Sequence, residues 1–198
     1  MATDQPTTSA YGLPEGLPKP VDDGACDHLP GQTLPALALP STAGAPIDLA
    51  SLPGRKVVYC FPRAGQPDAP MPAGWDEIPG ARGCTPQSLA FRDHYDKIRA
   101  LHAELFGLST QPPEAQSEIA TRLKLPFALL SDADLAFARA LRLPTLEVEG
   151  MTLIKRLTLM VNDGVIEKVF YPVFWPDQHA DEVIVWLLAH PQRPPQVG

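Results

Sequence analysis

Two kinds of apolar pattern follow one another along the middle of the chain, one typical of strands and the other of helices. The strand-like runs are short and rich in β-branched and aromatic residues, whereas the helical stretches repeat apolar residues three and four positions apart. In chain order we expect a small hairpin (34–39 and 47–49), a strand (56–61), a helix (85–107), a strand (108–109), a helix (114–123), a strand (127–130), a helix (132–141), two strands (157–161 and 165–170) and a helix (181–190). This order predicts an α/β fold, a central mixed sheet flanked by helices, with an antiparallel pair at one edge.

Two of these elements have clear boundary signals. Thr85 is a suitable N-cap residue and Pro86 suits the first helical position, so a helix is expected to begin there. The residues Asn162-Asp163-Gly164, between two β-rich runs, form the strongest hairpin signal in the chain. The two strands that flank them are therefore predicted to pair antiparallel.

Composition divides the chain into an arm, a domain and a tail. Residues 1–25 are rich in Pro, Gly, Asp and Thr without a period and are predicted to form an arm, which either lies on the domain or stays disordered. Residues 26–190 are predicted to form one domain, and residues 191–198 a short tail.

A proline-rich insertion interrupts the domain at residues 63–82. Prolines make up 24 of the 198 residues of the chain, or 12%, against roughly 5% in average proteins. Structureless loops of this length inside a compact domain tend to be functional. With Met71 and Trp75, the insertion is a candidate for a roof over a thiol pocket, for a dimer contact or for a plain surface loop.

Charge and hydropathy exclude several function classes. Sixteen Lys and Arg residues against 23 Asp and Glu give a formal net charge of −7, which argues against nucleic acid as a partner. The apolar run from Val183 to Ala189 is far shorter than the roughly 18 residues of a membrane span, and no secretory leader is legible, so we expect a cytoplasmic protein. No nucleotide-binding glycine motif and no metal-ligand spacing are present, so neither a cofactor nor a metal is expected.

Three cysteines, Cys26, Cys60 and Cys84, carry the remaining chemistry. They include no Cys-x-x-Cys pair, which argues against a disulfide framework or a zinc ribbon. Cys84 lies at the expected start of a helix, after Arg82 and Gly83, where free N–H groups and the positive end of the helix dipole favour a thiolate. Cys84 is therefore the candidate nucleophile, and the alternative is a small buried residue at a loop–helix junction.

Four blocks of the sequence resemble the peroxiredoxins of the Q (bacterioferritin-comigratory) type, in the order and spacing of that family. They are Val57-Val-Tyr-Cys-Phe-Pro62, Gly83-Cys-Thr-Pro-Gln-Ser-Leu-Ala-Phe-Arg-Asp93, Leu125-Pro-Phe-Ala-Leu-Leu-Ser-Asp132 and Lys155-Arg-Leu-Thr-Leu-Met-Val161. The resemblance implies a thioredoxin-like fold in its peroxiredoxin variant. It also implies thiol peroxidase activity toward hydrogen peroxide or organic hydroperoxides.

The resemblance further implies roles for individual residues. Cys84 would attack the O–O bond of a hydroperoxide and become a sulfenic acid. Arg156 would stabilise both the thiolate and the negative charge that develops on the leaving oxygen; the alternative for Arg156 is a solvated cation at a strand end. Pro62 corresponds to the family's proline at the end of a strand, although residues 63–82 separate it from Cys84.

One departure from the family pattern concerns the peroxide site itself. Ala81 occupies the position at which the family has a Thr or Ser hydroxyl, three residues before the cysteine. Thr85 or a backbone group of the loop is a candidate replacement, and the alternative is that Thr85 only caps the helix. Gln87 stands where the family often has Glu, and a residue of the first helical turn without a further role is its simplest interpretation.

A second departure concerns the fate of the oxidised cysteine. Leu89 occupies the position of the resolving cysteine that Q-type enzymes often carry, so a one-cysteine mechanism is expected. Cys26, interpreted as a surface thiol on the arm, is a candidate resolving residue, whereas Cys60 is expected to be an inert core residue. If no cysteine of the chain resolves Cys84, thioredoxin, glutaredoxin or a small thiol would reduce it. The protein itself is expected to be a monomer or a homodimer.

Two other function classes compete with the peroxidase. A non-catalytic redox sensor or binding protein on the same scaffold is favoured by Ala81 and Leu89, while Cys84 and Arg156 favour the enzyme. A thiol–disulfide oxidoreductase is disfavoured because the Cys-x-x-Cys motif is missing.

Overall fold

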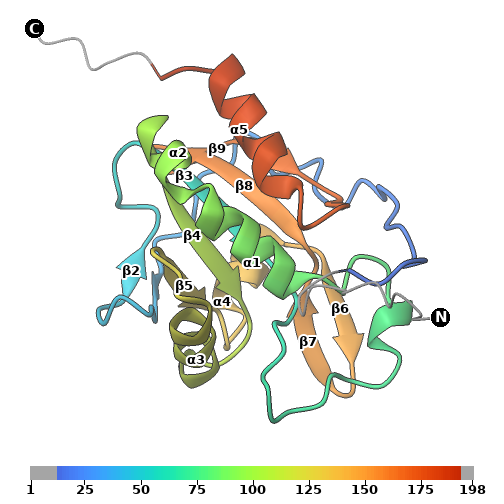
Figure 1. Cartoon of the computed structure of the whole chain (residues 1–198). Helices are drawn as coiled ribbons and strands as arrows, with labels where there is room; N and C mark the ends of the chain where they lie inside the picture. The colour runs from blue at the N-terminus through green and yellow to red at the C-terminus, as the bar shows by residue number, and fades with distance from the viewer. Residues whose placement is uncertain (1–12, 193–198) are drawn as a thin grey trace, which may run out of the picture.

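A five-stranded mixed sheet forms the centre of the computed structural model, which describes residues 13–192 (Figure 1). Its strands, in spatial order, are β5 (Ala128–Ser131), β4 (Ala103–Ser109), β3 (Arg55–Cys60), β8 (Leu157–Asn162) and β9 (Val165–Phe170). The first three are parallel to one another, and β8 is antiparallel to both β3 and β9. The predicted α/β fold with an antiparallel edge pair is confirmed.

Helices cover both faces of this sheet. They are α1 (Cys84–Asp93), α2 (Tyr95–Ala100), α3 (Pro113–Leu123), α4 (Ala136–Leu141) and α5 (His179–Ala189). Because side chains alternate along a strand, Val57 and Tyr59 of β3 contribute to a core cluster with α1, α2, α3 and α5, while Val58 and Cys60 join α4 in a second cluster. The two clusters are the two faces of the sheet.

Two small hairpins lie beside the sheet. The pair β1 (Ala38–Leu39) and β2 (Ile47–Asp48) matches the predicted hairpin, whereas the pair β6 (Thr145–Val148) and β7 (Met151–Ile154) was not predicted. The insertion contains one short 3₁₀ helix, η1 (Trp75–Glu77), and packs against the second hairpin in a separate apolar cluster. This cluster comprises Trp75, Ala81 and Leu153, with Met71 at its border.

The single helix predicted for residues 85–107 is wrong. The chain leaves α2 at Ala100, takes a positive φ at His102 and continues as β4. Since β4 lies between two strands and is buried on both faces, its apolar run cannot be distinguished from a helix by periodicity. Gly107 does not end a helix: a Cβ there would lie 2.5 Å from Leu129, so glycine allows close packing inside the sheet.

The described part of the predicted arm lies on the domain. Asp23 forms an ion pair with Lys155 at 3.2 Å and accepts a hydrogen bond from the Tyr171 hydroxyl at 2.9 Å. Cys26 is 6% exposed and belongs to the core cluster of α4, so its interpretation as a surface thiol is wrong. The rest of the predicted arm (1–12) and most of the predicted tail (193–198) lie outside the described residues.

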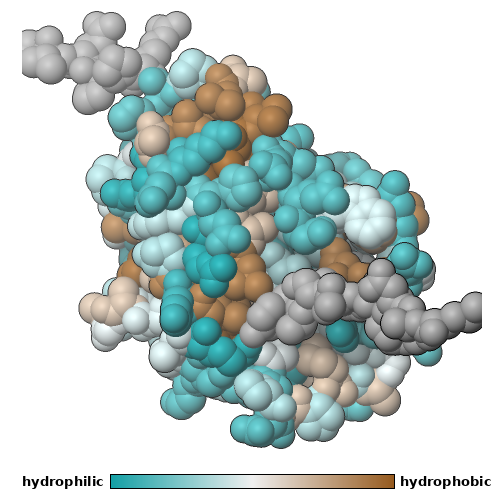
Figure 2. All heavy atoms as spheres, in the orientation of Figure 1, coloured by the Kyte–Doolittle hydropathy of each residue, from teal (hydrophilic) through white to brown (hydrophobic). Residues whose placement is uncertain are grey.

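The face drawn in Figure 2 is mostly polar, with apolar areas that include one over α5 near the top of the view; Val185 and Leu188 of this helix are exposed. Within residues 13–192, none of the helices combines the length and the apolar character needed to cross a bilayer.

Candidate active site

Cys84 is the first residue of α1 and is almost completely buried, with 3% of its surface exposed. The preceding Gly83 has a φ of 106°, which residues with a side chain rarely adopt. A Cβ atom on Gly83 would also lie 2.4 Å from Cγ of Pro176 and 2.9 Å from Cδ2 of Leu13. Glycine is therefore required at this position both by the turn into α1 and by the close approach of these two side chains.

Arg156 contacts the sulfur of Cys84 although it lies 72 positions later in the sequence. It precedes β8 by one residue, is 3% exposed, and its Nη2 donates a hydrogen bond to Cys84 Sγ at 3.1 Å. The same Nη2 also donates to the carbonyls of Ala81 (2.9 Å) and Arg82 (3.2 Å), and Nε donates to the carbonyl of Gly80 (3.1 Å). The interpretation of Arg156 as a solvated strand-end cation is therefore wrong.

The positive charge of this guanidinium lies directly against the sulfur. Apart from Sγ, each acceptor that the described residues offer to Arg156 is a neutral carbonyl or amide oxygen. The cation is therefore buried among neutral oxygens, with Sγ of Cys84 at 3.1 Å. In the thiol form, the S–H group can instead donate to the Ala81 carbonyl at 3.6 Å.

Gln87 is a site residue whose importance was missed in the sequence. It is fully buried one helical turn after Cys84, and its Oε1 accepts a hydrogen bond from Nη1 of Arg156. Because a guanidinium only donates, this contact leaves the Gln87 amide nitrogen facing away, without a partner among the described residues. The spacing of three residues on one helix was the available signal.

The structure brings the other expected residues only into the neighbourhood of the sulfur. Gly83, not Thr85, is the N-cap of α1, so the predicted capping role of Thr85 is wrong; Thr85 is half-buried in the first turn. Pro62 is buried, and two residues close to it in the sequence, Phe61 and Ala64, belong to the same core cluster as Cys84. Ala81 is fully buried and contributes only its carbonyl oxygen to the site.

Two buried polar pairs hold α1 and α5 against the sheet. The Tyr59 hydroxyl donates to Oγ of Ser88 at 3.0 Å, and burial raises the pKa of Tyr59, which keeps the phenol protonated. His179 makes hydrogen bonds to Glu182 Oε2 (2.8 Å) and Thr158 Oγ1 (2.9 Å). Burial lowers the pKa of His179, so the ring is neutral, with Nδ1–H donating to the carboxylate and Nε2 accepting from the hydroxyl.

The remaining cysteines belong to the opposite face of the sheet. Cys60 is fully buried, as predicted, and shares the core cluster of α4 with Cys26, whereas Cys84 belongs to the cluster of α1 and α5. Burial raises the pKa of Cys60, and burial together with Asp23 and Asp22 raises the pKa of Cys26 to about 12. All three thiols are free.

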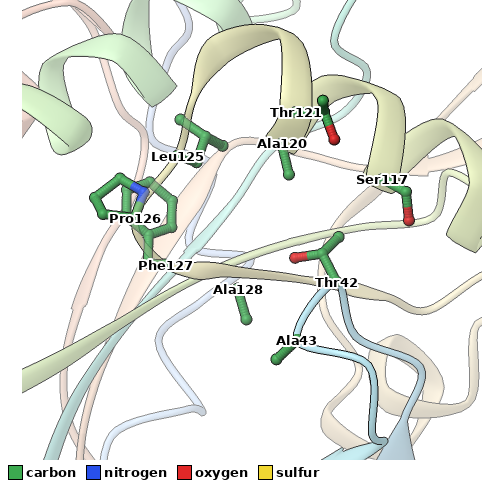
Figure 3. A pocket seen from close by; sticks show the side chains of 9 residues that line it. All are labelled: Thr42, Ala43, Ser117, Ala120, Thr121, Leu125, Pro126, Phe127 and Ala128. Atoms are coloured by element: carbon green, nitrogen blue, oxygen red, sulfur yellow. The ribbon is translucent and has the colours of Figure 1, made fainter.

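A cavity of about 420 Å³ lies between α3 and the segments 42–43 and 125–128 (Figure 3). The hydroxyl groups of Thr42, Ser117 and Thr121 and several apolar side chains line it, with no charged residue among them. Its lining includes neither Cys84 nor Arg156, so it is separate from the thiol site.

The fold and the thiol–guanidinium pair define a thioredoxin-like protein with a buried thiol at a helix N-terminus and an arginine against it. Comparison with known proteins agrees: the sequence model of the Redoxin family matches residues 29–184. Peroxiredoxin Q from Sedum lineare, a chloroplastic protein, is 32% identical over 154 residues, which cover 78% of this chain and 75% of the relative. Peroxiredoxin Bcp from Escherichia coli (strain K12) is 31% identical over 165 residues, which cover 81% and 96%.

A solved structure extends the agreement to three dimensions. The crystal structure of Peroxidoxin BcpB from Mycobacterium tuberculosis superposes with a TM-score of 0.68 at 26% identity, covering 83% of this chain and 100% of that one. This chain therefore belongs to the Redoxin family, among the Q/Bcp peroxiredoxins. It is accordingly a thiol-dependent peroxidase, and the alternative of a non-catalytic sensor or binding protein is not favoured.

Proposed function

We propose that this peroxiredoxin reduces hydroperoxides with Cys84 as the nucleophile and Arg156 as its electrostatic partner. The observation that carries the proposal is the hydrogen bond of 3.1 Å from Arg156 Nη2 to Cys84 Sγ inside a buried site. The same guanidinium that stabilises a thiolate is positioned to stabilise the oxygen that leaves when the O–O bond breaks.

The chemical step is a displacement at oxygen. The Cys84 thiolate attacks the terminal oxygen of the hydroperoxide, an S–O bond forms and the O–O bond breaks. The leaving alkoxide or hydroxide takes the electron pair of the broken bond and a proton from water, which leaves an alcohol or water and a sulfenic acid on Cys84. Sulfur is oxidised and the peroxide is reduced.

We propose Thr85 and Pro62 as the supporting residues of this step. Because Ala81 has no hydroxyl, Thr85, half-buried beside Cys84 in the first helical turn, is the proposed hydrogen-bond donor to the peroxide. Pro62 is the proposed wall, since its neighbours Phe61 and Ala64 pack in the same cluster as Cys84.

We further propose a one-cysteine mechanism with an external reductant. Cys26 and Cys60 pack in the core cluster of the opposite sheet face, and their raised pKa values keep them protonated at neutral pH, so they are poor nucleophiles toward the sulfenic acid. One thiol of thioredoxin, glutaredoxin or a small molecule would form a mixed disulfide with release of water, and a second thiol would release Cys84. Three free thiols favour the reducing environment of the cytoplasm as its location.

Stopped-flow kinetics test the proposal. Wild-type protein should react with hydrogen peroxide far faster than free glutathione does, and Cys84→Ser should abolish the reaction. Cys60→Ser, which removes a buried thiol on the other sheet face, is the matched control and should keep the wild-type rate. A wild-type rate no greater than that of glutathione would contradict the assignment of Cys84 as the nucleophile.

A further inference from the structure

Cys84 is enclosed, although the thiol of a peroxidase has to be reached by a peroxide and then by a reductant. Cys84 and Arg156 are each 3% exposed. To form a mixed disulfide, the sulfur of a reductant has to come within about 2 Å of Sγ, the length of an S–S bond. At least one of the segments that cover the site therefore has to move during each turnover.

An N-terminal segment, the strap (residues 13–23), is one of these covers. Cδ2 of Leu13 lies 2.9 Å from the place of a Cβ atom on Gly83, the residue before the nucleophile. Cβ of Pro20 lies 3.4 Å from the corresponding place on Gly80. The match to the Redoxin family begins at residue 29, so the strap lies outside the part of the chain that defines the family.

Little space remains under the strap. Leu13, Leu17 and Pro18 face the end of the insertion (78–82) and the segment 173–176 across a gap of only about 10 Å³. Such a volume is at the limit for one water molecule. The closed strap therefore leaves no room for hydrogen peroxide, with its two oxygen atoms, between these three described segments.

The other two covers are fixed by the site and by the core. The end of the insertion supplies Arg156 with three acceptors, the carbonyls of Gly80, Ala81 and Arg82, so its movement would break these hydrogen bonds. The segment 173–176 lies between β9 and α5, and both of these elements contribute to the core clusters. Of the three covers, the strap is the one that can move without disturbing the thiol–arginine pair.

Exposed polar contacts, which we call the latch, hold the strap down. Asp23 pairs with Lys155 at 3.2 Å and accepts a hydrogen bond from the Tyr171 hydroxyl at 2.9 Å; the carboxylate side chain is 48% exposed and the lysine side chain 37%. Exposed ion pairs contribute little to stability, so the latch opens at a modest cost. Gly24, directly after the latch, has a φ of 71°, and Cys26 beyond it is buried in the core. Gly24 is thus a hinge between a weak latch and a firm anchor.

We propose that the strap is a lid, which closes over Cys84 and lifts about Gly24 to admit the peroxide and then the reductant. The proposal rests on the proposed function, in that Cys84 is the thiol to be reached. If opening precedes attack, each reagent reacts in proportion to the open fraction of the molecules. Weakening the latch should therefore raise the rates with chemically different reagents by the same factor.

Two variants weaken the latch from opposite sides. Asp23→Ala removes both contacts and should raise the second-order rate with hydrogen peroxide roughly threefold to tenfold, the population shift that a few exposed contacts support. Alkylation of Cys84 by iodoacetamide, followed by peptide mass mapping, should rise by the same factor. Tyr171→Phe removes one contact and should give a smaller rise, and the double variant should react no faster than Asp23→Ala, because the two side chains share one bond.

Asp27→Ala is the matched control. It removes an exposed carboxylate four positions further along, beyond the hinge, and should keep the wild-type rates with both reagents. Thermal unfolding of each variant checks that the fold is retained.

The outcomes separate the lid from the proposed function. Unchanged or lower rates in both latch variants would overturn the lid, and so would a rise with one reagent only, because that would mean a change in the chemistry of the thiol and not in access to it. A wild-type rate with hydrogen peroxide no greater than that of glutathione, together with faster alkylation in Asp23→Ala, would support the strap as a lid and contradict the proposed function.

Discussion

Gln87 and Arg156 lie 69 positions apart in the sequence, yet the buried amide oxygen of Gln87 accepts a hydrogen bond from the Arg156 guanidinium. The bond ties the arginine to the helix that begins at Cys84, so the orientation of the cation and that of the nucleophile are fixed together. Gln87 is thus a positioning residue for Arg156.

Replacing Gln87 tests this role. Gln87→Leu removes the acceptor and leaves one N–H group of a buried guanidinium unpaired, so the second-order rate with hydrogen peroxide should fall about tenfold or more. Gln87→Glu keeps an acceptor of the same shape and should recover part of the rate, because its negative charge also pairs with the guanidinium and competes with the thiolate. Thermal unfolding of both variants provides the control. Equal loss in the two variants, with equal stability, would contradict a positioning role.

Replacing Arg156 should affect peroxide and alkylating agents alike. Arg156→Met removes the hydrogen bond to the sulfur and the buried positive charge, so the rate with hydrogen peroxide should fall roughly 100-fold, as expected for loss of one group that stabilises a developing anion. Arg156→Lys should recover only part of this rate, because an ammonium cannot reach Cys84, Gln87 and the loop carbonyls together. Iodoacetamide alkylation of Cys84 should slow in both variants. Alkylation at the wild-type rate in Arg156→Met would show that the arginine does not favour the thiolate.

Thr85 is tested by a pair of substitutions that separate its hydroxyl from its shape. Thr85→Ser keeps the hydroxyl and should retain the peroxide rate, whereas Thr85→Val keeps the shape and should lose about tenfold, the value of one hydrogen bond to a charged group. Iodoacetamide, which needs no such bond, should alkylate Cys84 equally in the two variants. Equal peroxide rates for Ser and Val would remove Thr85 from the mechanism.

The distribution of the cysteines predicts the products of oxidation. Since Cys26 and Cys60 lie in the core cluster of the other sheet face, hydrogen peroxide without a reductant should give sulfenic and then sulfinic acid at Cys84. Peptide mass mapping after dimedone labelling follows these species. A Cys26–Cys84 disulfide in the peptide map would contradict the one-cysteine mechanism, and Cys26→Ser serves as the control for it.

The sequence predicted the outline of the fold because most elements carry local signals. The hairpin of β8 and β9 follows from Asn162-Asp163-Gly164, and α3 follows from apolar residues at helical spacing. The fully buried strand β4 was assigned to a helix because burial on both faces removes the alternation that identifies a strand. The hairpin of β6 and β7 was missed although Glu149 and Gly150 both have positive φ, as in a two-residue turn.

For the candidate site, the sequence predicted the cysteine and the arginine but not their surroundings. Cys84 follows from its place at a helix start, and Arg156 follows from resemblance alone, because no local pattern links two residues 72 positions apart. The burial of Cys26 was not predictable from the composition of the arm, since it depends on packing against the α4 side of the sheet. A cavity of about 330 Å³ that Arg156 helps to line likewise arises from segments 19–23, 78–80 and 171–173, which only the tertiary structure brings together.

His179 should make the stability of the fold depend on pH. The ring lies between Phe91 and Phe170, with Glu182 and Thr158 as hydrogen-bond partners, and burial, together with the positive charge of Arg156, lowers its pKa below the usual 6.5. In the unfolded chain the histidine binds a proton as the pH falls through about 6.5, while in the folded protein it stays neutral until lower pH. The unfolded state then binds more protons, so the free energy of unfolding should decrease as the pH falls below about 6.5 and level off above it.

His179→Gln isolates this contribution. Glutamine can donate to Glu182 and accept from Thr158 but does not titrate, so the variant should be less stable than wild type at pH 8 because it loses the aromatic contacts. Its free energy of unfolding should fall less steeply than that of wild type between pH 6.5 and 5. Urea denaturation at a series of pH values measures both slopes, and His190→Gln, at an exposed site beyond α5, is the matched control. Identical pH slopes for wild type and His179→Gln would mean that the buried ring takes up its proton as readily in the folded protein as in the unfolded chain.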